Sequence, residues 1–236
     1  MMGRSSLANH DNSPTSLTER GLIDLTMPMS ERTIPFPGHP RPELEPLSPP
    51  VSDALRNTIM RSSISTGTHV DAPSHLVGAG PSIDQIPIER FWRPAVCLDL
   101  AGVVPRATVD LARLRRAGFS PARVSNAILL LATGWTDYAW QSERLFEDMP
   151  VLGEDAATAI AAARPAALGL DFAVDHDEPW PNHTILLGTE VVLIENLMNL
   201  RSLPQEGFEV IAFPHRLAGE GAAPARVVAS IPHSVW

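Results

Sequence analysis

Three side chains that can bind a metal ion or move a proton lie within one short stretch of the chain: His69, Asp71 and His75. In an extended chain, side chains two positions apart point to the same side, so we expect His69 and Asp71 to converge on one point. An imidazole and a carboxylate form a ligand set that zinc, manganese or iron accepts. Pro73 turns the chain, which brings His75 close to this point without requiring it to be a ligand. On spacing alone, a metal site and an Asp-Pro turn beside incidental histidines are equal alternatives.

A second polar segment follows much later. Glu195 comes directly after the apolar run 191–194, so its carboxylate emerges at the end of a predicted strand. A carboxylate buried at such a position needs a partner, and a metal ion is the natural one. We interpret the carboxylates of Asp175, Asp177 and Glu178 as groups that solvate a loop.

The composition argues against several classes of function. The chain has a formal net charge of −9 and its Lys and Arg residues are scattered, which does not suit a nucleic-acid partner. Its single cysteine, Cys97, lies in an apolar run and cannot form an internal disulfide. No segment stays apolar over about 18 residues, and the amino terminus lacks the layout of a signal peptide. We therefore expect a cytoplasmic protein without a membrane partner that acts on a small molecule.

The elements that must position these residues are many strands and few helices. Residues 1–20 are rich in Ser, Asn and Arg, which predicts a flexible tail, and we expect residues 21–236 to form a single domain. A proline-rich extended loop at 28–42 can wall a pocket. We predict strands at 22–26, 57–66, 95–100, 126–133, 167–171, 190–194, 209–213 and 225–231, helices at 108–117 and 155–163, and a short helix or turn at 82–91. This alternation predicts an α/β or α+β fold.

The run from Gly67 to His75 resembles the signature of a cyclase family that includes bacterial kynurenine formamidases, or arylformamidases, and isatin hydrolases. Other stretches resemble family landmarks in the same order: 23–26, 35–38, 133–135, 169–171, 183, 195–197 and 211–214. The resemblance implies a swivelling β/β/α domain with a mixed sheet. It also implies a homo-oligomer, either a dimer or a tetramer, and one or two divalent ions per subunit, zinc or manganese.

The resemblance also implies roles for individual residues. His69 and Asp71 would bind a first ion, and His183 a second. Asp71 and Glu195 would bridge the two ions. His75 would donate and accept protons as the catalytic residue, and Phe36 would stand against the substrate.

One position departs from the family pattern. The family has a further histidine two residues before the glycine, and this chain has Ser65 there. A serine hydroxyl is a weak ligand compared with an imidazole. Three outcomes follow: a single ion on Asp71, His183 and Glu195, a weaker first ion completed by water, or a site recruited to another reaction. We favour a single ion.

The leading hypothesis is a metal-dependent hydrolase that acts on a small aryl formamide, lactam or lactone through a metal-activated water. Phe36, Trp135 and Trp180 could stack on a planar substrate, although core packing explains both tryptophans equally well. A second hypothesis is a cyclase of an aromatic polyketide-type pathway with the same metal site. A third is a family member that has lost catalysis and only binds its ligand.

Overall fold

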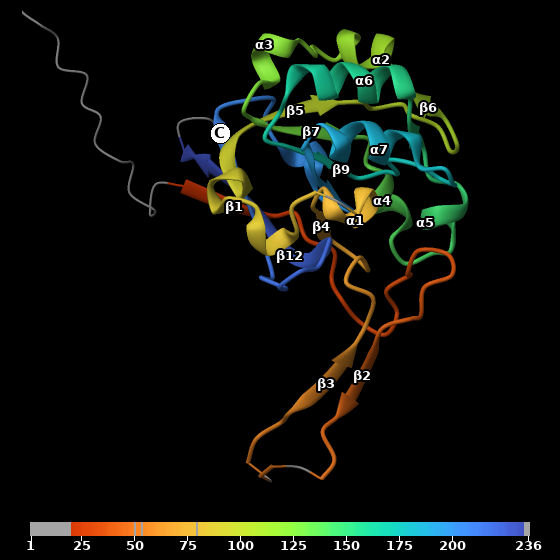
Figure 1. Cartoon of the computed structure of the whole chain (residues 1–236), viewed down its shortest axis with the longest axis vertical. Helices are drawn as coiled ribbons and strands as arrows, with labels where there is room; N and C mark the ends of the chain where they lie inside the picture. The colour runs from red at the N-terminus through yellow and green to blue at the C-terminus, as the bar shows by residue number, and fades with distance from the viewer. Residues whose placement is uncertain (1–19, 50, 53, 79, 234–236) are drawn as a thin grey trace, which may run out of the picture.

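One mixed sheet organises the part of the chain that the computed structural model describes, namely residues 20–49, 51–52, 54–78 and 80–233. Seven of its eight strands form a closed ring in the order β12, β11, β5, β7, β9, β10, β4 and back to β12, and β1 extends from β12 outside the ring (Figure 1). The strands are β1 Arg20–Asp24, β4 His69–Asp71, β5 Trp92–Asp99, β7 Ile128–Ala132, β9 Ala167–Leu170, β10 Val192–Glu195, β11 Phe208–Pro214 and β12 Ala222–Pro232. The predicted α/β fold with a mixed sheet is confirmed.

The long strand β12 closes the ring because two parts of one of its edges pair with two different strands. Its first residues pair with β4, where Ala222 lies opposite Asp71, and its last residues pair with β1, where Val228 lies opposite Asp24. The strands β5, β7, β9 and β10 run parallel to one another, and β4 runs antiparallel to β10. The closed ring therefore places the short strand β4 beside the carboxyl end of β10.

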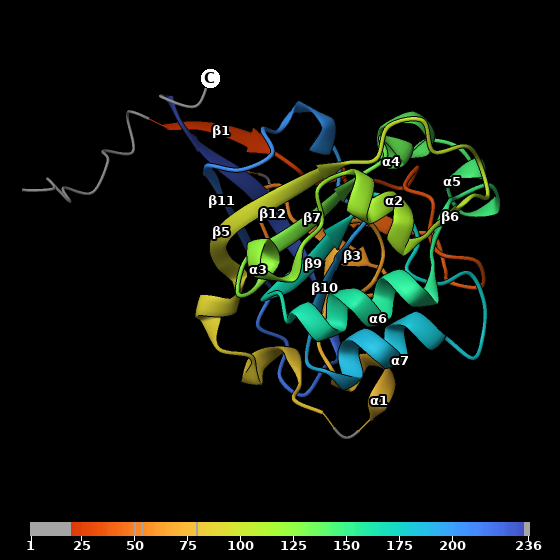
Figure 2. The ribbon, with the colours of Figure 1, turned by 90° about the horizontal axis from the view of Figure 1, so that it is seen from above.

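Helices cover the outer face of the ring on the side of β5, β7, β9 and β10 (Figure 2). The helices are α1 Ser74–Val77, α2 Leu111–Arg116, α3 Pro121–Val124, α4 Trp135–Ala139, α5 Arg144–Glu147, α6 Glu154–Ala163 and α7 Pro181–Gly188, with 3-10 turns η2 Ile83–Gln85, η3 Ile88–Phe91 and η4 Leu200–Ser202. Two short strand pairs lie apart from the ring, β2 Glu43–Pro46 with β3 Thr58–Arg61 and β6 Thr108–Val109 with β8 Val151–Leu152. No helix in the described part of the chain is long and apolar enough to cross a membrane.

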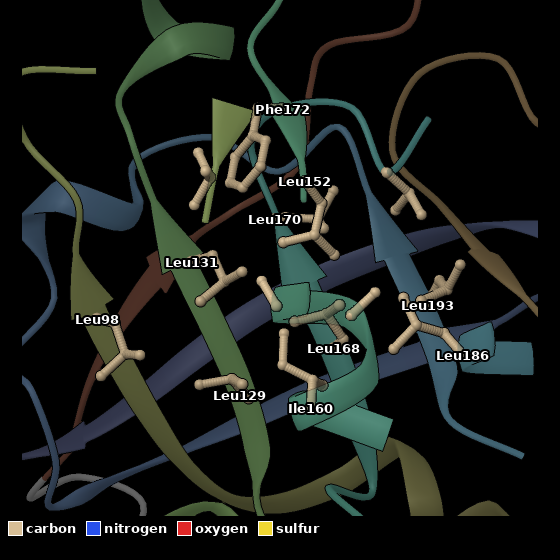
Figure 3. Close-up of a cluster of buried hydrophobic side chains, with 14 of the residues drawn as sticks. Leu98, Leu129, Leu131, Leu152, Ile160, Leu168, Leu170, Phe172, Leu186 and Leu193 are labelled. Carbon is tan, nitrogen blue, oxygen red and sulfur yellow. The ribbon is translucent and has the colours of Figure 1, made fainter. Parts of the chain in front are cut away.

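Successive side chains along each strand point outward and inward in turn, and this divides the buried residues into two cores. In β7, Leu129 and Leu131 face outward and pack in one cluster with Ile160 of α6 (Figure 3). Leu130 lies between them in the chain, belongs to the other cluster and faces the interior of the ring. The interior is narrow, since a Cβ at Gly169 of β9 would come within 2.5 Å of Leu130. Both faces of these parallel strands are thus buried, which explains why they appear in the sequence as continuous apolar runs.

Most predicted elements are present, and the differences have local causes. The predicted strand 57–66 is wrong beyond Arg61, because serines in 62–66 make local hydrogen bonds and the chain turns. The predicted helix 108–117 begins only at Leu111, because the side chain of Asp110 accepts a hydrogen bond from the Arg113 backbone N–H and caps it there. Helix α7 was not predicted, although Pro181 at its first position is typical of a helix start. The predicted tail lies outside the described residues, except that Arg20 already belongs to β1.

Candidate active site

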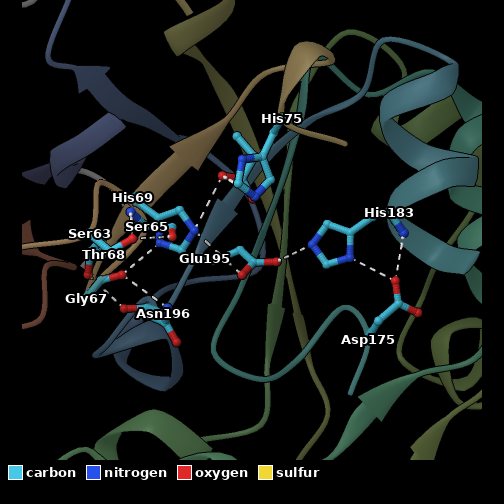
Figure 4. Close-up of polar contacts among 11 residues, drawn as sticks. Ser63, Ser65, Gly67, Thr68, His69, His75, Asp175, His183, Glu195 and Asn196 are labelled. Atoms are coloured by element: carbon cyan, nitrogen blue, oxygen red, sulfur yellow. Dashed lines mark hydrogen bonds and ion pairs between the residues drawn. The ribbon is translucent and has the colours of Figure 1, made fainter. Parts of the chain in front are cut away.

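Strand register brings three of the predicted metal ligands together. In the antiparallel pair of β4 and β10, Glu195 lies directly opposite His69, and Asp71 emerges on the same face two residues further along β4. The Nε2 atom of His69 lies 3.4 Å from Asp71 Oδ1 and 3.7 Å from Glu195 Oε2 (Figure 4). One ligand atom from each of these residues lies within 4.8 Å of the other two, which is a grouping that could hold a metal ion.

The turn before β4 fixes how the His69 ring points. Gly67 has a φ of +72°, which glycine adopts without strain, and its carbonyl accepts a hydrogen bond from His69 Nδ1 at 2.9 Å. Thr68 donates its hydroxyl to the Asn196 carbonyl, and the Asn196 side chain donates to Gly67. Because a carbonyl only accepts, Nδ1 carries a proton, and Nε2 is the ring nitrogen that faces the carboxylates.

Helix α7 supplies His183 from the other side of Glu195. Its Nε2 lies 3.3 Å from Glu195 Oε1, while its Nδ1 donates to Asp175 Oδ2 at 2.8 Å. Asp175 also accepts hydrogen bonds from the backbone N–H groups of Asn182 and His183 at the start of α7. The interpretation of Asp175 as a solvated loop residue is therefore wrong: its side chain is buried and fixes the His183 ring. The missed signal was Pro181, which marks a helix start just beyond this aspartate.

Several oxygens in this cluster are buried without a hydrogen-bond partner among the described residues. They are both carboxylate oxygens of Asp71 and Oε1 of Glu195. Leaving a buried carboxylate oxygen unpaired is costly, so the arrangement is satisfied only when positive charge lies between these groups. Two imidazole Nε2 atoms and two carboxylates match the mixed nitrogen and oxygen preference of zinc and manganese. The residues present therefore fit a divalent ion.

Burial and the neighbouring charges act in opposite directions on these groups. Burial by itself lowers the pKa of His69, but the carboxylates of Asp71 and Glu195 outweigh it and raise that pKa to about 9. Burial likewise opposes protonation of His183, yet its hydrogen bond to Asp175 and the nearby Glu195 raise the pKa to about 10. For Asp71, burial favours the neutral acid, but the positive charge of His69 lowers the pKa to about 2. The cluster thus attracts cations strongly, whether protons or a metal ion.

His75 stands beside the cluster, at its solvent side. It belongs to the one-turn helix α1, its Nε2 lies 3.9 Å from Asp71 Oδ1, and its side chain is 34% exposed. Gly221 allows α1 to lie this close to β12, because a Cβ at Gly221 would come within 2.4 Å of the His75 Cα. His75 is therefore placed to reach a bound molecule without being among the three converging ligands.

A cavity of about 270 Å³ opens over the cluster. His69, Asp71, His75, His183 and Glu195 line one side of it. The other side is aromatic and includes Phe36, Phe146, Trp180, Phe172 and His39.

The aromatic rings of this wall contact one another and reach the histidines. Phe36 packs edge-on against Phe146 at 5.5 Å and against Trp180 at 6.0 Å between ring centroids. Trp180 in turn packs edge-on against His183. Phe36 thus lines the pocket, whereas Trp135 is buried in the outer core and its Nε1 donates to the Leu145 carbonyl.

Ser65 also lines this cavity, but it is not one of the three converging ligand residues. Its hydroxyl lies 3.1 Å from the hydroxyl of Ser63, so the two serines satisfy each other. The side of the cluster where the family pattern has a histidine therefore offers only a neutral hydroxyl pair.

This chain is similar to known proteins in sequence and in fold. Kynurenine formamidase from Salinibacter ruber is 29% identical over 213 residues, which cover 88% of this chain and 96% of that protein. Isatin hydrolase A from Ralstonia solanacearum has the same fold, with a TM-score of 0.78 and 24% identity over 93% of this chain and 98% of that one. A structure described as a potential metal-dependent hydrolase with cyclase activity has a TM-score of 0.74 and 24% identity, over 89% of this chain and 98% of that one.

A family model described as Putative cyclase matches residues 23–176, a span that contains His69, Asp71 and His75. This match covers more than half of the chain. The chain therefore belongs to that family.

Proposed function

We propose that this protein is a metal-dependent hydrolase that cleaves a small aryl formamide, lactam or lactone. The observation that carries the proposal is the pair of Asp71 oxygens, which have no hydrogen-bond partner in the described part of the chain and line a cavity with histidines and aromatic rings. The names of the relatives, kynurenine formamidase and isatin hydrolase, support hydrolysis of an amide attached to an aromatic ring. Both features suit a planar substrate whose carbonyl group is directed at the cluster.

The proposed ion is a single zinc or manganese. His69, Asp71 and Glu195 would hold it, and His183 would be a fourth ligand from the other side of Glu195. The proposed set thus adds His69 to the Asp71, His183 and Glu195 of our sequence-based hypothesis. The paired hydroxyls of Ser63 and Ser65 support one ion rather than two, because a second ion would find few strong ligands left. When bound, a divalent ion supplies Lewis acidity, which lowers the pKa of water and polarises a carbonyl oxygen.

The side chains around the ion would do the remaining work. His75 lies within reach of a molecule in the cavity, and an imidazole can act as both a general base and a general acid. In the proposed reaction, water adds its oxygen to the carbonyl carbon and gives a proton to His75. The carbon–nitrogen or carbon–oxygen bond then breaks, and His75 returns that proton to the leaving atom. Phe36 and Trp180 would hold the aromatic ring, and Asp175 would keep His183 oriented.

A small substrate panel tests this proposal. We expect the protein loaded with zinc or manganese to hydrolyse at least one of N-formylkynurenine, isatin and simple aryl esters, with loss of activity after chelation. A metal-loaded protein that leaves a broad set of aryl amides, lactams and lactones intact would overturn the proposal.

A second candidate, carbon–carbon ring closure by the same site, is favoured by one observation. Ser65 stands where the family pattern has a histidine, and it lines the cavity. A cyclase would bind the ion yet leave every hydrolytic substrate intact, and the same panel therefore separates the two functions. A protein that has lost catalysis and only binds its ligand would bind an aromatic amide without converting it.

A further inference from the structure

Strands β4 and β10 stop pairing at two of the proposed metal ligands. Their antiparallel ladder contains three residue pairs, and the last of them joins Glu195 to His69. The end of a ladder opens more easily than its middle, because the last pair has a neighbouring pair on one side only. Strand β12 holds the other edge of β4, but that pairing does not fix the distance between β4 and β10. A contact beyond the last pair is therefore needed to keep Glu195 beside His69.

Asn196 supplies this contact. It follows Glu195 directly and makes two hydrogen bonds to the turn that precedes His69 (Figure 4). Its side-chain Nδ2 donates to the Gly67 carbonyl at 3.1 Å, and its backbone carbonyl accepts from the Thr68 hydroxyl at 2.7 Å. All three residues of this contact are buried. We call these two hydrogen bonds the latch.

The latch requires an uncommon backbone conformation at Asn196. Its φ is +56°, in the left-handed region that asparagine adopts more readily than most residues other than glycine. In this conformation, the side chain and the backbone carbonyl of one residue both reach the turn before β4. Glycine could adopt the same backbone but would supply only one of the two hydrogen bonds.

The partners of Asn196 in the latch also bond to other groups. The Gly67 carbonyl accepts a second hydrogen bond, from His69 Nδ1 at 2.9 Å. The Thr68 hydroxyl accepts from the Met27 backbone N–H at 2.8 Å while it donates to Asn196. The carbonyl oxygen that Asn196 holds is thus the same atom that orients the His69 ring.

We propose that Asn196 is a positioning residue of the metal centre, which keeps the Gly67 carbonyl in place for His69 Nδ1 and Glu195 in place beside His69 Nε2. This inference rests on the proposed function, because the centre that Asn196 serves is the proposed one. Asn196 acts through its two neighbours, the Gly67 turn and Glu195. Loss of its side chain leaves every proposed ligand present but frees the turn to move away from the end of β10.

A purely structural role for the latch predicts a different result. Two buried hydrogen bonds would then stabilise the fold, and their loss would lower the midpoint of unfolding without changing the metal affinity of the folded protein. Asn199 is a matched control for this distinction. Its φ is +60° and its Nδ2 donates to the Asp24 carbonyl at 2.8 Å, but it does not line the cavity.

The first test compares the zinc affinity of Asn196→Gly and Asn199→Gly. Glycine keeps the left-handed backbone at each position, so only the side chain is lost. Competition with a chelator is measured at a temperature where circular dichroism shows both variants fully folded. We expect affinity to fall at least about tenfold in Asn196→Gly and to match wild type in Asn199→Gly. Unchanged affinity in Asn196→Gly would overturn the proposal.

Thr68 tests the other half of the latch. Thr68→Val has nearly the same shape but no hydroxyl, whereas Thr68→Ser keeps the hydroxyl that donates to Asn196. We expect weaker zinc binding in Thr68→Val and most of the wild-type affinity in Thr68→Ser. Equal affinities in these two variants would contradict a positioning role for the Thr68 hydroxyl.

Proton NMR of the metal-free protein tests the link to His69 without metal or activity. The Nδ1 proton of His69, identified by its absence in His69→Gln, should exchange slowly with water in the wild type. We expect at least tenfold faster exchange in Asn196→Gly and no change in Asn199→Gly. Equally slow exchange in Asn196→Gly would overturn the action through Gly67. A wild-type protein that binds no metal contradicts the proposed function, whereas metal binding that Asn196→Gly leaves unchanged contradicts only this inference.

Discussion

Glu195 lies directly opposite His69 in the pair of β4 and β10, and it approaches His69 with one carboxylate oxygen and His183 with the other. Glu195 is therefore the residue that joins the two halves of the site. One half comes from β4 and the turn before it, and the other from α7. The cross-strand register, rather than proximity in the sequence, sets the distance between them.

The hydrogen bond from His183 to Asp175 leads to a first prediction. Asp175→Asn removes the carboxylate that accepts from His183 Nδ1, so the ring loses its fixed orientation. Loss of such a supporting group typically weakens metal binding by about 10- to 100-fold. Competition with a chelator measures the change. Asp177→Asn, an exposed position in the same loop, is the matched control and should bind metal like wild type.

Proton release on metal binding is a second prediction. In the metal-free protein, the pKa of His69 is raised to about 9 and that of His183 to about 10, so both rings carry an extra proton at pH 7. An ion needs the neutral Nε2, so binding must displace these protons, and affinity should rise with pH until it passes these pKa values. Titration calorimetry in two buffers of different ionisation enthalpy counts the protons. Binding without proton release would show that neither histidine is a ligand.

The contact between Gly221 and α1 gives a third prediction. In Gly221→Ala, the new Cβ would lie 2.4 Å from the His75 Cα, so α1 must move and His75 must move with it. Small displacements of a reacting group can cost about 100-fold in rate, so we expect kcat/KM to fall at least about tenfold at unchanged metal content. Gly188→Ala, where a Cβ meets nothing within 4 Å, controls for the substitution itself. Equal activity in the two variants would contradict the role of His75.

A fourth prediction concerns Asp171, which organises the loop after β7. Its buried carboxylate accepts hydrogen bonds from the backbone N–H groups of Thr133 and Gly134 and from the Thr133 hydroxyl. Asp171→Ala leaves these donors unpaired and should lower the free energy of unfolding by about 2–4 kcal/mol. Denaturant unfolding measures this loss. Asp99→Ala, at an exposed strand end, should cost less than about 1 kcal/mol, and similar losses in both variants would contradict the account.

Much of this site could be predicted from the residues themselves. Strand periodicity predicted that His69 and Asp71 share one side, and the apolar run before Glu195 predicted a carboxylate at a strand end. The pairing of β4 with β10 could not be predicted, because register depends on how the whole ring closes around β12. The role of Asp175 was missed because an aspartate that caps a helix and one that solvates a loop look alike until the helix itself is recognised.

The strands were predicted with unequal success. Long apolar runs such as β7 predicted buried strands correctly, because burial on both faces leaves a clear signature. Residues 57–66 were predicted as one strand that leads into the site. Only β3 within them is a strand, and nothing local shows that it pairs with β2 and ends at Arg61. Local sequence patterns do not show which distant parts of the chain an element contacts.

Elemental analysis of the purified protein, with Asp71→Asn as comparison, tests the central claim most directly. We expect close to one zinc or manganese ion per chain in the wild type after supplementation. In Asp71→Asn, which loses the negative charge between the imidazoles, we expect a large loss of bound metal at unchanged secondary structure. A wild-type protein that retains no transition metal, or an Asp71→Asn variant that retains as much as wild type, would contradict the metal centre proposed for this site.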